Sequence, residues 1–208
     1  MSAVARMVML NLRTVAPYRN QGLAVFAVMV VLFVNRPVVL VPMLVLLFTA
    51  TVAAYPFNVG DKARIETLYA TLPLPRRAVL AGHYAWALAC YLGTVVAGTA
   101  LTVLLAWAQS VSFGGRTLTA VLTLSWGVFA INVAVQFPLF IRYGYTRVNL
   151  LSTVLPIAFV GTLVVRLHLS LASVHTWLPW TWPAGAALIV ASAAAVTAFD
   201  SRRGHLRT

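Results

Sequence analysis

The sequence predicts an all-α integral membrane protein with six transmembrane helices, an N-terminal interfacial amphipathic helix and a short cytoplasmic helix between spans two and three. Of its 208 residues, 62% are hydrophobic and only 9% are charged, whereas soluble domains average about 45–50% apolar and about 25% charged residues. The apolar residues form long runs separated by short basic turns. An apolar run of about 20 residues is long enough to cross a bilayer as a helix.

Residues 1–16 are predicted to form a helix that lies in the membrane interface. Arg6 and Arg13, seven residues apart, share one side of this helix. The opposite side is apolar and comprises Val4, Met7, Val8, Leu12 and Val15. A basic amphipathic helix of this kind is typical of a segment that lies on the bilayer instead of spanning it. A cleaved signal peptide is the alternative, which we reject because the apolar run after Gly22 leads directly into a second one.

The rest of the chain divides into spans and connections within a single transmembrane domain. Spans one and two form a helical hairpin that turns at Asn35-Arg36-Pro37. The predicted segments are 17–54 for spans one and two, 55–80 for a polar cytoplasmic loop, 81–139 for spans three and four, 140–148 for a cytoplasmic turn, 149–199 for spans five (149–165) and six (184–199) with an outer loop at 166–182, and 200–208 for a basic tail.

The distribution of Lys and Arg predicts that both termini are cytoplasmic. With the N-terminus inside, twelve of the fifteen basic residues fall in cytoplasmic segments and three fall outside, namely Arg36, Arg116 and Arg166. All three acidic residues also fall inside. Cytoplasmic connections of membrane proteins carry an excess of Lys and Arg, so a bias of four to one supports both the number of spans and their orientation.

The longest polar interruption, residues 55–84, contains a candidate docking helix. Its apolar residues follow the helical spacing i, i+3, i+4 and i+7: Ile65, Leu68, Tyr69 and Leu72. Its charged residues alternate in sign: Asp61, Lys62, Arg64 and Glu66. Asp61 is expected in the first turn, where a negative charge suits the helix dipole. Such a helix offers a surface to a soluble partner, and the alternative is an ordinary solvated loop.

Two spans carry patterns of small or polar residues. In span four, Ser125, Asn132 and Gln136 are spaced by seven and four residues and form one polar stripe on a helix. This stripe predicts either a substrate path or a seam between helices, where polar side chains hydrogen-bond to fix packing. In span six, Ala187, Ala191 and Ala195 have the small-xxx-small spacing that lets helices approach closely. Span six is therefore predicted to be a packing helix.

No catalytic constellation is present in the sequence. Only three acids exist and every His is near the end of an apolar run, which disfavours a membrane enzyme, including an intramembrane serine protease. Cys90 is alone, so it forms no intrachain disulfide and no cysteine metal site. His168 and His175 lack a third ligand. The scattered basic residues form no basic, aromatic groove for nucleic acid. We expect no metal, cofactor or nucleic acid on this chain.

The sequence also lacks a source of energy for transport. No span carries Asp, Glu, Lys or Arg in its middle, although ion-coupled transporters usually need ionisable groups there. The chain has no GxxxxGK[ST] phosphate loop for ATP. If the protein moves a solute uphill, the energy enters from outside the membrane. These two absences and the cytoplasmic helix indicate a permease that a separate ATPase drives.

In the order of these elements the chain resembles the small permease subunits of bacterial ABC type-2 exporters. In that family, a helix of mixed charge leads to a motif similar to SLP-x-x-R and then to a GKY-like span entry. The counterparts here are Thr71 to Arg77 (TLPLPRR) and Gly82-His83-Tyr84, with His83 where the family usually has Lys. A second match is Phe137 to Arg147 (FPLFIRYGYTR), which is similar to the family's PLYFKFG-x-x-K/R turn after span four.

The resemblance implies two permeases, identical or homologous, and two ATPase subunits in the bacterial cytoplasmic membrane. Asp61 to Leu72 would be the coupling helix that fits the ATPase. Arg142, Tyr143 and Arg147 would belong to a second, smaller cytoplasmic contact. ATP and magnesium would bind the partner and not this chain. The uncharged spans predict an apolar or amphipathic cargo such as a peptide, lipid or drug. The alternative is a non-transporting membrane scaffold or peptide-immunity protein.

Overall fold

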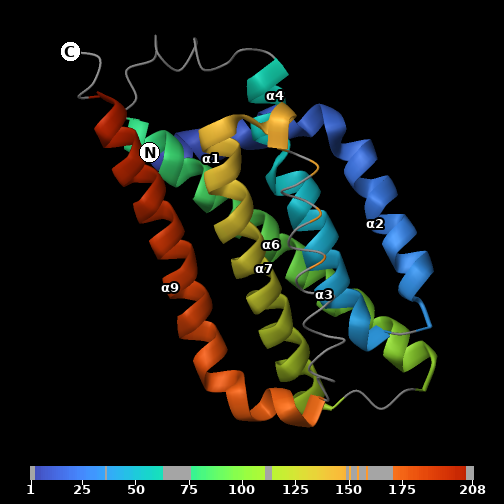
Figure 1. The fold of residues 1–208 in the computed structure, drawn as a ribbon. Coiled ribbons are helices and arrows are strands. Elements are labelled where there is room, and N and C mark those ends of the chain that lie inside the picture. The colour runs from blue at the N-terminus through green and yellow to red at the C-terminus, as the bar shows by residue number, and fades with distance from the viewer. Residues whose placement is uncertain are drawn as a thin grey trace.

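The described elements of the chain are all helical. The computed structural model describes residues 3–35, 37–62, 76–110, 114–148, 150, 154, 158 and 171–204. The elements are α1 (Ala3–Val15), the 3-10 turn η1 (Ala16–Tyr18), α2 (Arg19–Phe33), α3 (Pro37–Phe48), the π-helical turn η2 (Thr49–Ala53), α4 (Tyr55–Lys62), α6 (Arg76–Ala108), α7 (Gly115–Tyr143) and α9 (Leu171–Gly204), as Figure 1 shows. Because no strand occurs among the described residues, the all-α prediction is confirmed for them.

Five stretches of the described residues are long and apolar enough to cross a membrane. They are Ala3–Phe33, Leu40–Lys62, Arg77–Ala108, Gly115–Tyr143 and Pro179–Ala198. These stretches contain predicted spans one to four and most of span six. Predicted span five, residues 149–165, lies outside the described residues except for helical positions 150, 154 and 158. The count of six spans therefore stays a prediction.

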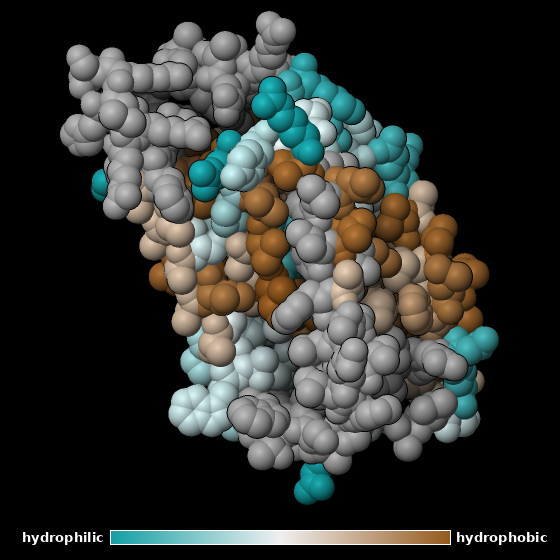
Figure 2. All heavy atoms as spheres, viewed as in Figure 1, coloured by the Kyte–Doolittle hydropathy of each residue, from teal (hydrophilic) through white to brown (hydrophobic). Residues whose placement is uncertain are grey.

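The long helices run side by side and present apolar side chains outward. In Figure 1, α2, α3, α6, α7 and α9 share the long direction of the bundle, while α1 crosses one end. Large apolar side chains are exposed on the outer faces, among them Leu23, Val31, Val96, Trp107 and Val190. Figure 2 shows a hydrophobic band across the middle of the molecule, between more hydrophilic ends. An exposed apolar surface of this size is typical of a face that contacts lipid.

The ends of the bundle differ in charge. The N-terminus, the end of α4, the start of α6, the end of α7 and the end of α9 gather at one end in Figure 1. We call it the basic end, because it carries most of the described cationic side chains: Arg6, Arg13, Arg19, Lys62, Arg77, Arg142 and Arg147. Arg116 lies at the opposite end, at the start of α7. The described basic residues are thus divided between the two ends of the bundle as the charge pattern predicted. The orientation of these ends in a membrane stays a prediction.

The core lies between α3, α6 and α7. Its buried side chains come from all three helices and from η2: Val41, Val45, Ala53, Ala87, Tyr91, Val121, Phe129, Val133 and Phe137. A second cluster joins α2 to α3 through Met29, Leu40 and Leu44. Burying a large apolar side chain in contact with others gains dispersion energy, and a bilayer adds no hydrophobic drive between helices. Close packing of this kind therefore holds the bundle together.

Helix α1 docks on α6 through Met7 and Asn11. Met7, which belongs to the predicted apolar face, and Asn11 are buried, while Leu12 of the same face is 52% exposed. The two helices approach closely at Gly82 in α6, because a Cβ atom there would lie only 2.6 Å from the Cβ of Met7. Only glycine leaves room for this approach. The close contact at Gly82 of α6 therefore determines which face of α1 is buried.

The C-terminal third differs from its predicted description in two details. Residues 171–182, predicted as part of the outer loop 166–182, are helical and form the first part of α9. Pro179 and Pro183 lie inside this helix, and Figure 1 shows a bend near its start, as prolines commonly cause. Span six was predicted to be a packing helix, and α9 does pack on α7, whereas Ala187, Ala191 and Ala195 are exposed on this chain. Gly185 and Ser192 face α7 instead, where the indole of Trp126 fills the space beside Gly185.

Candidate functional site

The two predicted cytoplasmic contacts are joined directly at the basic end. Asp61 of α4 accepts two hydrogen bonds at Oδ2, one from the backbone N–H of Thr146 (2.9 Å) and one from its Oγ1 (3.0 Å). Residues 145–148 are helical, so the carboxylate lies at the start of a helical turn, where an anion is stabilised. The end of α4 and the turn after α7 therefore form one surface.

Gly144 makes this approach possible. Its φ is +81°, a left-handed conformation that suits glycine, and its N–H donates to the carbonyl of Phe140 (3.0 Å) to end α7. A Cβ atom at position 144 would also lie 3.1 Å from Oδ2 of Asp61. The backbone conformation thus favours glycine at this position, and the absence of a side chain also leaves room for the carboxylate of Asp61.

Phe57, one helical turn before Asp61, anchors α4 in the bundle. Its ring centroid lies 4.6 Å from that of His83, 5.1 Å from that of Phe137 and 5.5 Å from that of Phe140. Aromatic pairs at these separations are stabilising beyond their buried area. Since Phe57 and Asp61 are four residues apart, they share one face of α4. This face holds α4 on α6 and α7, and we call these contacts the α4 anchor.

His83 links the α4 anchor to α1. The residue is buried, and its Nδ1 lies 3.5 Å from the amide Nδ2 of Asn11, also buried. The sequence predicted only that His83 sits at the membrane edge. In the structure it contacts α1 through Asn11 and α4 through Phe57. Three elements meet at this side chain.

The other predicted contact residues divide into exposed and undescribed ones. Lys62, Arg142, Tyr143 and Arg147 are exposed at the basic end, and the guanidinium carbon of Arg142 lies 5.2 Å from the ring centroid of Tyr143. Six of the predicted ATPase-coupling residues lie outside the described residues: Arg64, Ile65, Glu66, Leu68, Tyr69 and Leu72. Asp61 was expected in a first turn but occupies the last turn of α4. There the dipole of α4 disfavours a carboxylate, and the bonds from Thr146 offset this.

The polar stripe of α7 is buried against α3. Ser125, Asn132 and Gln136 are each no more than 2% exposed. Ser125 Oγ donates to the carbonyl of Val121 (2.7 Å) within α7, whereas Asn132 Nδ2 reaches the carbonyl of Leu46 in α3 (3.4 Å). That carbonyl lies just before the π-helical turn η2. The contact of Asn132 is that of a seam between helices, and a substrate path along the stripe stays a prediction.

Asn132→Leu should lower the free energy of unfolding by about 0.5–1.5 kcal/mol, because interhelical hydrogen bonds in membranes average about 0.6 kcal/mol and reach about 1.7. Thermal unfolding in detergent measures the change. Ser125→Ala is the matched control, since its hydroxyl bonds within its own helix, and it should change stability less. A larger loss for Ser125→Ala than for Asn132→Leu would contradict the seam.

The described residues contain no group of three His, Cys, Asp or Glu side chains that could hold a metal ion. Sequence reasoning missed Phe57, Asn11 and Thr146 as members of the site. One signal was present for Phe57, which lies four residues before Asp61 and so shares its helical face. Nothing in the sequence indicated Asn11 and Thr146, because their partners are 72 and 85 residues away along the chain.

The fold defines the class of the protein: a multi-pass helical membrane protein whose polar connections meet at one end. A family profile described as "ABC-2 family transporter protein" matches residues 12–199. The chain therefore belongs to the ABC-2 transporter family and is a membrane permease of an ABC transporter. Permeases of this family are transport subunits that work with an ATP-binding cassette partner. No curated protein and no solved structure matches the chain.

Proposed function

We propose that this chain is the membrane-spanning subunit of a bacterial ABC exporter, driven by a separate ATPase through the cytoplasmic loop 55–80. The observation that carries the proposal is the bond between Asp61 and Thr146. It joins the start of this loop to the turn after α7. Phe57, the centre of the α4 anchor, lies one helical turn before Asp61. A partner that moves the loop would therefore move α4 and the end of α7 together.

The assembly follows from the family and the charge pattern. Grouping of the cationic side chains at the basic end supports a cytoplasmic position for that end and for both termini in the inner membrane. The partner is an ABC ATPase that binds ATP and magnesium. A second permease, identical or homologous, completes the assembly. The direction of transport is taken from the resemblance to type-2 exporters.

The cargo is proposed to be apolar or amphipathic, such as a peptide, a lipid or a drug. In the described spans the buried polar side chains are uncharged: Thr94, Thr102, Thr123, Ser125, Asn132, Gln136 and Ser192, with His83 near the basic end. Burying a full charge in the membrane without a partner costs several kcal/mol. A path through these helices therefore suits a molecule without exposed charge.

Co-purification tests the proposal. The tagged chain is expressed together with a candidate phosphate-loop ATPase from the same organism, and we expect the ATPase to be recovered with the wild-type chain. Combining Ile65→Asp, Leu68→Asp and Tyr69→Asp should abolish recovery while the chain stays in the membrane, because three charges replace the apolar face of the predicted coupling helix. Immunoblotting of the membrane fraction and of the eluate gives both quantities.

A control variant carries added charges in the connection between α6 and α7, which is predicted to lie outside. Val111→Asp combined with Phe113→Asp, in the segment between α6 and α7, should leave recovery of the ATPase unchanged. Retained binding by the triple variant would refute the coupling role of the loop. If the Glu66→Cys variant is labelled from the outside of intact cells, the proposed orientation is refuted. Absence of any co-purifying ATPase would favour the scaffold or immunity function.

A further inference from the structure

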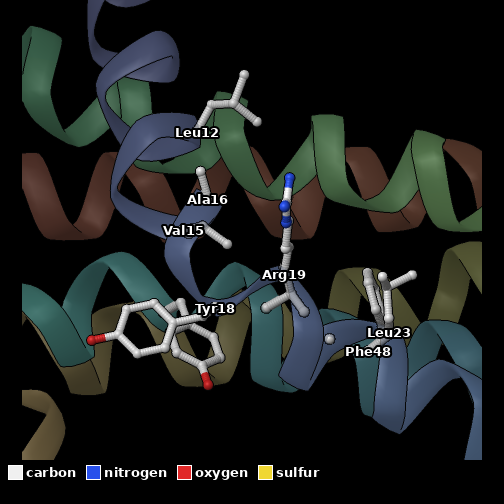
Figure 3. A pocket seen from close by; sticks show the side chains of 10 residues that line it. Leu12, Val15, Ala16, Tyr18, Arg19, Leu23 and Phe48 are labelled. Atoms are coloured by element: carbon white, nitrogen blue, oxygen red, sulfur yellow. The ribbon is translucent and has the colours of Figure 1, made fainter.

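A groove with apolar walls lies where α1 and η1 pass into α2 (Figure 3). Its volume is about 330 Å³, at the lower limit of the roughly 300–1,000 Å³ common for small-molecule sites. One wall comes from the end of α1, with Leu12 and Val15, and the other from Phe48 and Val52 at the junction of α3 and η2. The groove lies near the basic end, and Tyr55, the first residue of α4, also lines it.

Gly22 keeps the groove open. A Cβ atom at this position would lie 3.8 Å from Cε2 of Phe48 and 3.9 Å from Cγ2 of Val52. These are ordinary contact distances, so a larger side chain would fill the space between α2 and the wall formed by α3 and η2. Leu23, also in the lining, is 64% exposed, so the groove is continuous with the outer apolar surface of α2.

Arg19 supplies one positive charge to this apolar groove. Its aliphatic stem belongs to the lining and the residue is exposed, and Figure 3 shows it between Leu12 and Ala16 on one side and Phe48 and Leu23 on the other. Among the described side chains the one carboxylate is that of Asp61, which is bound by Thr146. A cation whose stem lies on apolar walls and whose charge is free suits a ligand with an apolar tail and an anionic head.

The aromatic residues of the groove place it at the depth of lipid headgroups. The rings of Tyr18 and Tyr55 lie 4.9 Å apart, and the hydroxyl of Tyr55 donates to Oε1 of Gln21 on the exposed side. Tyrosines with one apolar and one wet end gather at the membrane interface. A phospholipid at this depth places its acyl chain along the walls and its phosphate beside Arg19.

We propose that this groove binds one anionic phospholipid, with an acyl chain between α1, α2 and α3 and the phosphate on Arg19. Charge complementarity selects an anionic lipid over a zwitterionic one, and the apolar walls select a lipid over a free phosphate. Transport and the ATPase play no part in this inference, which requires only that the chain is embedded in a bilayer.

The test counts bound lipid on the whole chain. The protein is reconstituted in nanodiscs of equal parts phosphatidylglycerol and phosphatidylcholine and then released into mild detergent. Native mass spectrometry measures the mass of the chain with its bound lipids. We expect one retained phosphatidylglycerol per chain. Arg19→Gln should lower its retention about fivefold, since one Arg near an anionic surface contributes about 1 kcal/mol, and Arg19→Lys should restore most of it.

Two further variants separate the groove from general surface charge. Arg13→Gln removes the same charge from α1 without touching the lining and should leave retention unchanged. Gly22→Leu should reduce retention of both lipids by filling the groove. Equal losses for Arg13→Gln and Arg19→Gln would overturn the proposal, as would equal retention of the two lipids by the wild-type chain. Recovery of a non-lipid amphiphile in the groove would overturn it as well.

Discussion

Phe57→Ala should raise amide hydrogen exchange across Tyr55–Lys62 by about a hundredfold. Truncating a buried Phe costs about 3–5 kcal/mol, and the half-buried ring of Phe57 places its loss near the lower value. A local opening made easier by about 3 kcal/mol is populated about a hundredfold more. The alanine side chain no longer packs against the rings of His83, Phe137 and Phe140. Hydrogen exchange with mass spectrometry on the chain in nanodiscs measures this directly.

Phe26→Ala is the matched control for this experiment. Phe26 is also half-buried, and its ring packs edge-on against Phe48 at 6.3 Å between α2 and α3. Phe26→Ala should lower the unfolding temperature by about as much as Phe57→Ala does. It should leave hydrogen exchange in α4 unchanged. If α4 exchanges equally in the two variants, Phe57 does not anchor α4. The proposed transmission from loop 55–80 to α7 would then lose its physical basis.

Gly82→Val should lower the free energy of unfolding by about 1–3 kcal/mol, the cost of overpacking a close contact. The new side chain would occupy the space of Met7, whose Cβ lies 2.6 Å from the position of a Cβ on residue 82. Helix α1 would have to move away from α6, and the contact between Asn11 and His83 would break with it. Denaturation followed by tryptophan fluorescence measures the loss.

Gly93→Val provides the comparison on the same helix. No atom lies within 4 Å of a Cβ built on Gly93 in the described structure, so valine meets open space there. Both substitutions change helix propensity in the same way, and their difference therefore isolates the contact with Met7. Gly93→Val should stay within about 0.5 kcal/mol of the wild-type chain. Equal effects of the two valines would show that α1 does not dock at Gly82.

The connections were harder to predict than the long helices, as two cases show. Residues 171–182 contain three Trp and one Pro and are interrupted by polar residues, so composition predicted a loop where α9 begins. In α4, residues 55–62 carry an Asn, a Gly and two charges, and composition placed them in the loop. In both segments an aromatic side chain packs against a neighbouring helix. Trp126 stacks on Trp182 at 5.3 Å, and Phe57 fills the space between α6 and α7.

The sequence alone determined that this chain is a multi-pass helical membrane protein of the ABC-2 permease type, because apolar run length, charge sorting and short motifs are local properties. Tertiary structure decided which faces meet. It buried Asn11 beside His83, turned Ser192 toward α7, and placed the carboxylate of Asp61 on Thr146. Each of these contacts joins residues more than fifty positions apart, and their geometry depends on where a glycine allows two backbones to approach.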